Sequence, residues 1–211
     1  MAKGSSGISR KQMRVADRRR LLVEAALRVM AREGVAAAST RAITQEAGMP
    51  HGAFHYCFEG KQDLYRALLA AEIDVDLDAL WASVVPSAAP ADVLEALLLA
   101  QWTPIEADPD AQLVLFELGE LALRDPDLRE LAEWEQRAAV DKATEALERL
   151  VTDLSWTLAR PPRAVAQLTV ATVDGVARAW LRHRDDDQAR ATLSDLASLL
   201  ATFVAQNGTD L

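Results

Sequence analysis

The amino-acid sequence predicts an all-α fold in which a small three-helix domain precedes a larger helical domain. Ala and Leu dominate the composition, whereas the 211 residues include only 9 Gly and 8 Pro, and this balance favours helix. Apolar residues recur at three- and four-residue spacing along most of the chain, and no segment shows a convincing strand pattern. Half of the residues are hydrophobic, so a sizeable core is available.

The N-terminal segments predict three helices joined by short turns. A first helix over residues 15–33 is indicated by its apolar face and by Gly34, which suits the end of a helix. A second helix begins after Ser39 or Thr40 as N-cap and ends at Gly48. A third, expected over residues 51–57, makes a helix-turn-helix with the second.

The remaining helices are punctuated by proline. A long amphipathic helix is expected from Lys61 to just before Pro86, followed by helices that begin near residues 90, 108, 125, 161 and 186. Asp125 before Pro126 is a typical start signal, and Asp186 or Asp187 is expected to cap the last helix.

The charge distribution is strongly asymmetric. The whole chain carries −9, but residues 1–66 hold twelve Lys and Arg against six Asp and Glu, a net +6, which leaves −15 on the remainder. A basic head on an acidic body is expected when one end meets a polyanion. A solvated basic arm without a partner is the alternative, and residues 1–14 are predicted to form a flexible basic arm.

Sequence features favour a cytoplasmic protein. The first residues are polar and basic and lack the apolar stretch of a secretory signal, and no apolar run approaches the ~18 residues of a membrane span. The single cysteine excludes an internal disulfide framework and fits a reducing compartment.

The stretch GMPHGAFHYCFEGKQDL, residues 48–64, concentrates aromatic and imidazole groups. On a helical wheel His51, His55 and Tyr56 share one side with the bare backbone of Gly52, whereas Phe54 falls on the packing side. An outward face of donors and acceptors on the second helix of a helix-turn-helix suits the DNA major groove.

Neighbouring residues are suited to the DNA backbone. Thr40 begins the second helix, where its hydroxyl and free N–H groups can meet a phosphate. Lys61 opens the fourth helix behind Gly60, and Arg41 has forked donors for a guanine edge or a phosphate.

Residues from about 15 to 68 resemble the DNA-binding domain of the tetracycline-repressor (TetR) family of transcriptional regulators. The resemblance rests on LLVEAALRVMAREG and on STRAITQEAGMPHGAFHYCFEGKQDLYRAL. It implies DNA contact by Thr40, Arg41, Pro50, His51, Gly52, Ala53, His55, Tyr56 and Lys61, of which Thr40, Tyr56 and Lys61 match phosphate-contacting positions. Two positions depart from the family's pattern, because His55 stands where Tyr is usual and Cys57 where His is frequent.

The resemblance further implies that residues 15–60 form the DNA-binding domain and residues 61–211 a domain that binds a small effector and forms a homodimer. An apolar or aromatic effector is expected to contact Leu98, Trp102, Leu113, Phe116, Glu120, Trp134 and Asp174. A four-helix interface made by the last two helices and their symmetry mates is expected to use Val170, Ala177, Trp180, Leu181, Leu196, Leu199, Leu200 and Phe203. The spacing of Asp174 and Arg178 predicts a surface ion pair by default, with pocket or interface contacts as alternatives.

Other classes of site have weaker support. His51 and His55 lack further metal ligands nearby, and the carboxylates beside His183 are expected in a solvated loop. Cys57 is expected to be a small buried hydrophobe rather than a redox sensor. No catalytic motif is present, so we predict no enzyme activity, cofactor or metal. The alternative to a homodimeric repressor on a near-palindromic operator is a helical ligand-binding or catalytic protein whose basic head has an unrelated purpose.

Overall fold

The computed structural model describes residues 14–73, 78, 81, 84 and 88–206, so the predicted arm lies outside the described residues except for Arg14. The helices are α1 (Val15–Glu33), α2 (Thr40–Glu46), α3 (Gly52–Cys57), α4 (Lys61–Ile73), α6 (Pro90–Ala107), α7 (Pro109–Arg124), the short 3₁₀ helix η2 (Pro126–Leu128), α8 (Arg129–Asp153), α9 (Pro162–His183) and α10 (Asp186–Ala201). The prediction of an all-α fold is confirmed. The expected extension of the fourth helix towards Pro86 falls largely outside the described residues.

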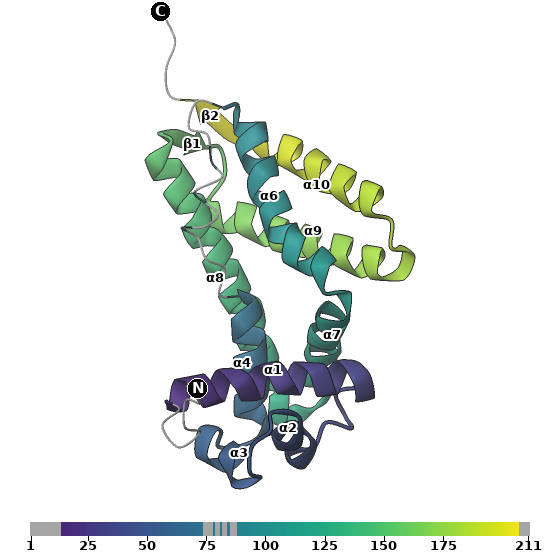
Figure 1. Ribbon diagram of the computed structural model, residues 1–211. Coiled ribbons are helices and arrows are strands. Elements are labelled where there is room, and N and C mark those ends of the chain that lie inside the picture. Colours follow the sequence, from purple (N-terminus) through teal and green to yellow (C-terminus); the bar gives the residue numbers. More distant parts are fainter. Residues whose placement is uncertain (1–13, 74–77, 79–80, 82–83, 85–87, 207–211) are drawn as a thin grey trace, which may run out of the picture.

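Two short strands, which the sequence did not indicate, pair near the end of the chain. β1 (Trp156–Leu158) runs antiparallel to β2 (Val204–Gln206), with Thr157 opposite Ala205. Three residues per strand are too few to show the alternation that identifies a strand in a sequence. The pairing ties the end of α10 to the loop after α8 (Figure 1).

Helices α1 to α3 form a head at one end of the molecule, with α1 lying across α2 and α3 (Figure 1). Its core includes Leu22, Ile43, Phe54 and Leu64, all fully buried. Helices as short as α2 and α3 are unstable alone in water, so their apolar side chains must be covered by α1 and α4.

Local signals fix the turn between α2 and α3. Ser39 caps α2, because its Oγ accepts a hydrogen bond from the Ala42 N–H at 3.1 Å. At the other end Gly48 has a φ of +64°, a left-handed conformation that glycine adopts at little cost. The Met49 N–H then donates to the Thr44 carbonyl at 2.8 Å, which closes the helix end and turns the chain towards α3.

An ion pair joins α1 to the start of α4. The guanidinium of Arg19 donates to the Asp63 carboxylate at 3.1 Å and to the Cys57 carbonyl at 2.7 Å, and it stacks on the Phe58 ring at 4.3 Å. Asp63 also accepts from the Glu59 N–H at 3.3 Å. The hydrogen bond from Arg19 lowers the pKa of Asp63 below its ordinary value.

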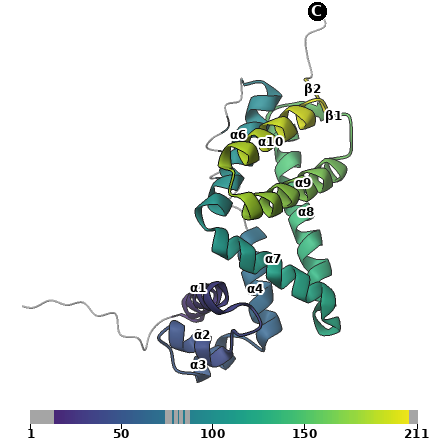
Figure 2. The ribbon, with the colours of Figure 1, turned by 90° about the vertical axis from the view of Figure 1, so that its right-hand side faces the viewer.

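Helices α6, α8, α9 and α10 form the body, with α10 beside α6 and α9 against α8 (Figures 1 and 2). Helix α4 contributes Leu64, Tyr65, Leu68 and Leu69 to the core of the head, and α7 adds Val114, Leu118 and Ala122. The domain boundary expected between residues 60 and 61 therefore falls at the start of α4, a helix that packs into the core of the head. None of the helices in the described segments is long and apolar enough to cross a membrane.

The start of α10 differs from the sequence prediction. Asp185, not Asp186 or Asp187, is the N-cap, since its carboxylate accepts from the Gln188 N–H at 2.9 Å. Asp186 instead accepts a hydrogen bond from the Trp180 indole N–H at 2.7 Å. The run of three aspartates made the cap ambiguous by one residue.

Candidate functional site

Helix α3 presents a polar outer face and an apolar inner face. Phe54 is 0% exposed and Tyr56, two residues later, is 66% exposed. His51 and His55 are exposed on the outer face with their rings edge-on and 5.8 Å apart. A Cβ atom added at Gly52 would meet nothing within 4 Å, so the backbone between the two imidazoles is open. Cys57 is buried, in keeping with a packing role.

The nine predicted DNA-binding residues lie on or near the surface of the head. Exposed are Arg41, Pro50, His51, Gly52, His55, Tyr56 and Lys61, while Thr40 and Ala53 are partly buried. Thr40 and Lys61 are the first residues of α2 and α4. The structure thus brings residues from α2, α3 and α4 together around the outer side of α3.

The cations of the head differ in how far they are neutralised. Arg28 and Arg32 both pair with Glu46, and Arg20 pairs with Glu24. Within the described residues Arg41 and Lys61 take part in no ion pair, which leaves their charges available to an external anion.

A cavity of about 470 Å³ lies in the body, within the range typical of small-molecule sites. Its apolar wall is formed mainly by side chains of α6, α8, α9 and α10, namely Leu94, Leu97, Leu98, Leu147, Leu150, Val170 and Leu200. Polar side chains gather elsewhere, on α4, α7, α8 and α9, and include Glu72, Gln112, Glu120, Glu135, Asp174 and Arg178.

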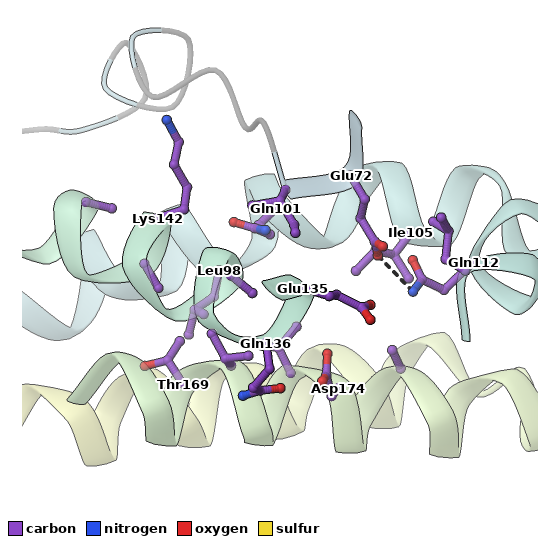
Figure 3. A pocket seen from close by; sticks show the side chains of 18 of the residues that line it. Glu72, Leu98, Gln101, Ile105, Gln112, Glu135, Gln136, Lys142, Thr169 and Asp174 are labelled. Atoms are coloured by element: carbon purple, nitrogen blue, oxygen red, sulfur yellow. Dashed lines mark hydrogen bonds between the residues drawn. The ribbon is translucent and has the colours of Figure 1, made fainter. Parts of the chain in front are cut away.

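Three carboxyl groups from three helices point into the same part of the cavity (Figure 3). Glu72 accepts a hydrogen bond from the Gln112 amide at 3.0 Å, whereas Glu135 and Asp174 have no hydrogen bond within the described segments. All three carboxyl groups line the cavity, where the surrounding walls withdraw them partly from bulk water.

Desolvation is also the main cause of raised pKa values in this cluster. It raises the pKa of Glu72 and of Asp174. Burial, assisted by the charges of Glu72 and Asp174, raises the pKa of Glu135 to about 7. Among the residues that the structure describes, no group of three or more His, Cys, Asp or Glu is placed to hold a metal ion.

The basic residues of the cavity already have acidic partners. Arg178 donates to Glu120 at 3.2 Å and covers the Phe116 ring at 4.1 Å. Lys142 pairs with Glu145 at 3.5 Å. Asp174 and Arg178 both line the cavity, as the pocket alternative expected, and within the described residues Arg178 forms its ion pair with Glu120 rather than with Asp174.

The predicted effector-binding residues divide into two groups. Leu98, Phe116, Glu120 and Asp174 line the cavity, whereas Trp102, Leu113 and Trp134 do not. Trp102 is buried edge-on against Trp180, and Trp134 lies beneath the guanidinium of Arg66. Leu113 is 54% exposed on the outer side of α7.

Glu72, Gln112 and Glu135 also line the cavity but were absent from the sequence prediction. A signal existed for Gln112, because it precedes Phe116 and Glu120 at four-residue intervals on the same face of α7. Glu72 and Glu135 stand on other helices, and only the packing of α4 and α8 brings them to this face.

The residues predicted for the dimer interface mostly face the interior of the protomer. Ala177, Trp180, Leu196 and Leu200 are buried, and Val170, Leu181 and Phe203 are partly buried. Only Leu199 of this set is well exposed, at 49%. Apolar periodicity identifies the buried face of a helix. In α9 and α10 most of that face is covered by α8, by α6 and by their contact with each other.

Comparison with known sequences places the head in a family. Residues 22–68, which run from α1 into α4, match the family described as bacterial regulatory proteins, tetR family. A curated relative, the helix-turn-helix nicotine-responsive transcriptional repressor HdnoR of Paenarthrobacter nicotinovorans, is 33% identical over 110 residues. That alignment spans 52% of this chain and 57% of the relative, so the chain matches little more than half of that protein's length.

Solved structures resemble the chain over most of its length. A transcriptional regulator from Rhodococcus sp. Rha1 has a TM-score of 0.66 at 22% identity, covering 88% of this chain and 97% of the other. The multidrug binding protein EbrR, solved with ethidium, has a TM-score of 0.59 at 27% identity, covering 85% and 98%. The helix-turn-helix match assigns the head, residues 22–68, to the tetR family of bacterial regulatory proteins, and the solved structures share the all-α architecture of the rest of the chain.

Proposed function

We propose that the protein is a homodimeric, cytoplasmic transcriptional repressor that leaves a near-palindromic operator when a small effector binds in the body. The observation that carries this proposal is the outer face of α3. It exposes His51, His55 and Tyr56 beside Arg41 and Lys61, two cations that form no ion pair with the described part of the chain, within the segment that matches the tetR family.

In this proposal α3 enters the major groove. His51 and His55 offer imidazole nitrogens to base edges, and the bare backbone at Gly52 permits a close approach. Thr40, Tyr56 and Lys61 contact phosphates, which fix the register of the helix on the duplex. Arg41 is placed to contact either a guanine edge or the backbone.

Helices α4 and α7 both reach from the cavity to the head, so a shift of either helix in the cavity would also move the head. Helix α4 is 13 residues long, about 20 Å, with Lys61 at its start and Glu72 near its end in the cavity. Helix α7 packs Leu118 into the head core and lines the cavity with Phe116 and Glu120. An effector that favours one arrangement of these helices would shift the head and weaken binding to two half-sites at fixed spacing.

The proposed subunit interface uses the outward faces of α9 and α10, onto which Figure 2 looks. The outward face of α9 carries Leu168, Ala171, Gly175 and Ala179, and α10 exposes Leu199. Small side chains allow helices to approach closely, so this face suits a four-helix contact.

Substituting Leu199 by Glu tests that interface. A carboxylate at the centre of an apolar contact leaves a buried, unpaired charge, so we expect the variant to sediment as a monomer and to lose most operator affinity. Ser198→Glu, a matched change on the neighbouring position, distinguishes the centre of the contact from its edge. A Leu199→Glu protein that remains dimeric would place the interface elsewhere.

The relatives support effector-controlled repression, since HdnoR is named as a nicotine-responsive repressor and EbrR was solved with ethidium. An apolar or aromatic effector fits the leucines, Trp81 and Phe116 of the cavity wall. The competing proposal, a helical binding protein whose head has another purpose, predicts no sequence-specific DNA binding.

Fluorescence anisotropy with the intergenic DNA beside the protein's own gene, against a scrambled duplex at two salt concentrations, tests the proposal. We expect a preference for the intergenic DNA that persists at the higher salt. Equal and salt-sensitive binding to both duplexes would contradict a repressor acting at that site.

A further inference from the structure

The cavity has different chemistry at its two ends. Leu147 and Leu150 of α8 lie beside Leu94, Leu98 and Leu200, whereas Glu135 of the same helix lies in the acidic cluster. Glu135 and Leu147 are separated by about 18 Å of helix at ~1.5 Å per residue. A molecule that fills the cavity therefore meets apolar side chains at one end and carboxyl groups at the other.

The negative charge at the acidic end is only partly balanced by the protein, because the single guanidinium of Arg178 stands against Glu120, Glu135 and Asp174. Arg178 is engaged by Glu120, and Lys142 points away from the cluster towards the edge of the cavity (Figure 3), where Glu145 is its partner. Within the described residues, the Gln112 amide is the one hydrogen-bond donor to Glu72, Glu135 and Asp174. Carboxyl groups that are partly withdrawn from water by cavity walls are costly unless a partner compensates them.

A metal ion does not fit this arrangement. Within the described part of the chain these carboxyl groups do not converge as a metal-binding group, and a hard divalent cation needs several oxygens around one point. Carboxylates spread along one end of an otherwise apolar cavity suit a cation whose charge is diffuse or attached to an apolar body.

We propose that the cavity binds an amphiphilic organic cation, a protonated amine or quaternary ammonium, with its positive group among Glu72, Glu135 and Asp174 and its apolar body against the leucines of α6, α8 and α10. This inference rests on the proposed function and specifies its effector. A neutral or anionic molecule would leave the carboxyl groups unpaired or would be repelled by them.

Ligand binding is coupled to proton release in this site. Glu135 faces Glu72 from α4, Glu120 from α7, and Asp174 and Arg178 from α9. With a pKa of about 7 it is partly protonated at neutral pH, and a bound cation replaces that proton. The affinity for a permanent cation should then rise about ten-fold between pH 6 and pH 8.

Three probes with one tail and different head groups test the charge preference: decyltrimethylammonium, decan-1-ol and decanoate, titrated below their micelle concentrations by isothermal calorimetry. We expect the ammonium to bind at least about ten-fold more tightly than the alcohol and decanoate to bind least. Equal or tighter binding of the alcohol or of decanoate would overturn the proposal.

Isosteric amides locate the binding group. Glu135→Gln and Asp174→Asn should each weaken ammonium binding about ten-fold, remove part of its pH dependence and leave decan-1-ol binding unchanged. Glu133→Gln, an exposed position on the same helix that does not line the cavity, should change none of these and controls for the acidity of the whole surface. If Glu135→Gln and Asp174→Asn both bind the ammonium as the wild type does, the cation is held outside this cluster and the assignment fails.

Operator release distinguishes this inference from the proposed function. If the ammonium binds in the cavity and the operator complex persists, the cation assignment stands and effector-controlled repression fails. If decan-1-ol or decanoate releases the operator and the ammonium does not bind, repression stands and the cation assignment fails.

Discussion

The head and the body place their charges in opposite ways. In the head the core is apolar and the cations lie outside, so Phe54 stabilises α3 while Tyr56 and the histidines remain exposed to a partner. In the body the cavity holds carboxyl groups inside, and the residues suited to bind a ligand cost stability while it is absent. The comparison shows that stability and recognition are separated on two faces of one helix in the head, whereas they compete for the same residues in the cavity.

The largest expected effect tests that separation in the head. Phe54→Ala removes a fully buried ring and should lower the free energy of unfolding by about 3–5 kcal/mol. Tyr56→Ala, two residues away, should change it by no more than about 0.5 kcal/mol but should weaken operator binding. Urea unfolding followed by circular dichroism measures both. A comparable loss of stability in the Tyr56 variant would mean that the outer face also holds the fold together.

A second comparison distinguishes exposed cations that contact DNA bases from those that contact phosphates. Arg41→Ala and Lys61→Ala should each cost about 1–3 kcal/mol of operator binding. Lys61→Ala should do so similarly for all duplexes, with a salt dependence reduced by about one ion, whereas Arg41→Ala should also lower the preference for the operator. Arg137→Ala, an exposed arginine on α8, is the control for net charge. Normal binding by the Lys61 variant would remove that residue from the phosphate contacts.

The sequence predicted the head more completely than the cavity, for a physical reason. The residues of the α3 face occupy one continuous stretch, and a helical wheel orders Phe54 inside and Tyr56 outside before any tertiary contact is known. The cavity collects Glu72, Glu135 and Asp174 from three helices, and only their packing brings them together. Trp102 and Trp180 show the same limit, since Trp102 was expected to contact the effector and Trp180 to lie at the dimer interface, whereas the two buried rings pack on each other.

In the cavity, removing a charge is expected to raise the stability of the fold. The raised pKa of Glu135 means that the folded state binds more protons than the unfolded state between about pH 4.5 and 7, so the free energy of unfolding falls as pH rises through this range. Glu135→Gln mimics the protonated acid and should be more stable than the wild type by about 1–3 kcal/mol at pH 8, with little difference at pH 4.5. Thermal unfolding at the two pH values, with Glu133→Gln as control, measures this. A gap that is equal at both pH values would exclude ionisation as its cause.

The smallest effect has the opposite dependence on pH and comes from the head. Asp63 has a lowered pKa because Arg19 donates to it, so the pair stabilises the fold above the ordinary pKa of Asp, and this contribution is lost as pH falls through the lowered value. Asp63→Asn should cost up to about 1 kcal/mol at pH 7, because the pair is partly exposed and screened by water. The difference in the free energy of unfolding should disappear in acid, where the protonated Asp63 of the wild type is as neutral as the Asn of the variant. Glu33→Gln, which breaks a more exposed pair with Arg32, should leave the unfolding curve unchanged. If the Asp63→Asn protein is still less stable than the wild type at low pH, packing around Cys57 and Phe58, rather than charge, joins α1 to α4. The contrast between a stabilising charge in the head and a destabilising charge in the cavity would then rest on Glu135 alone.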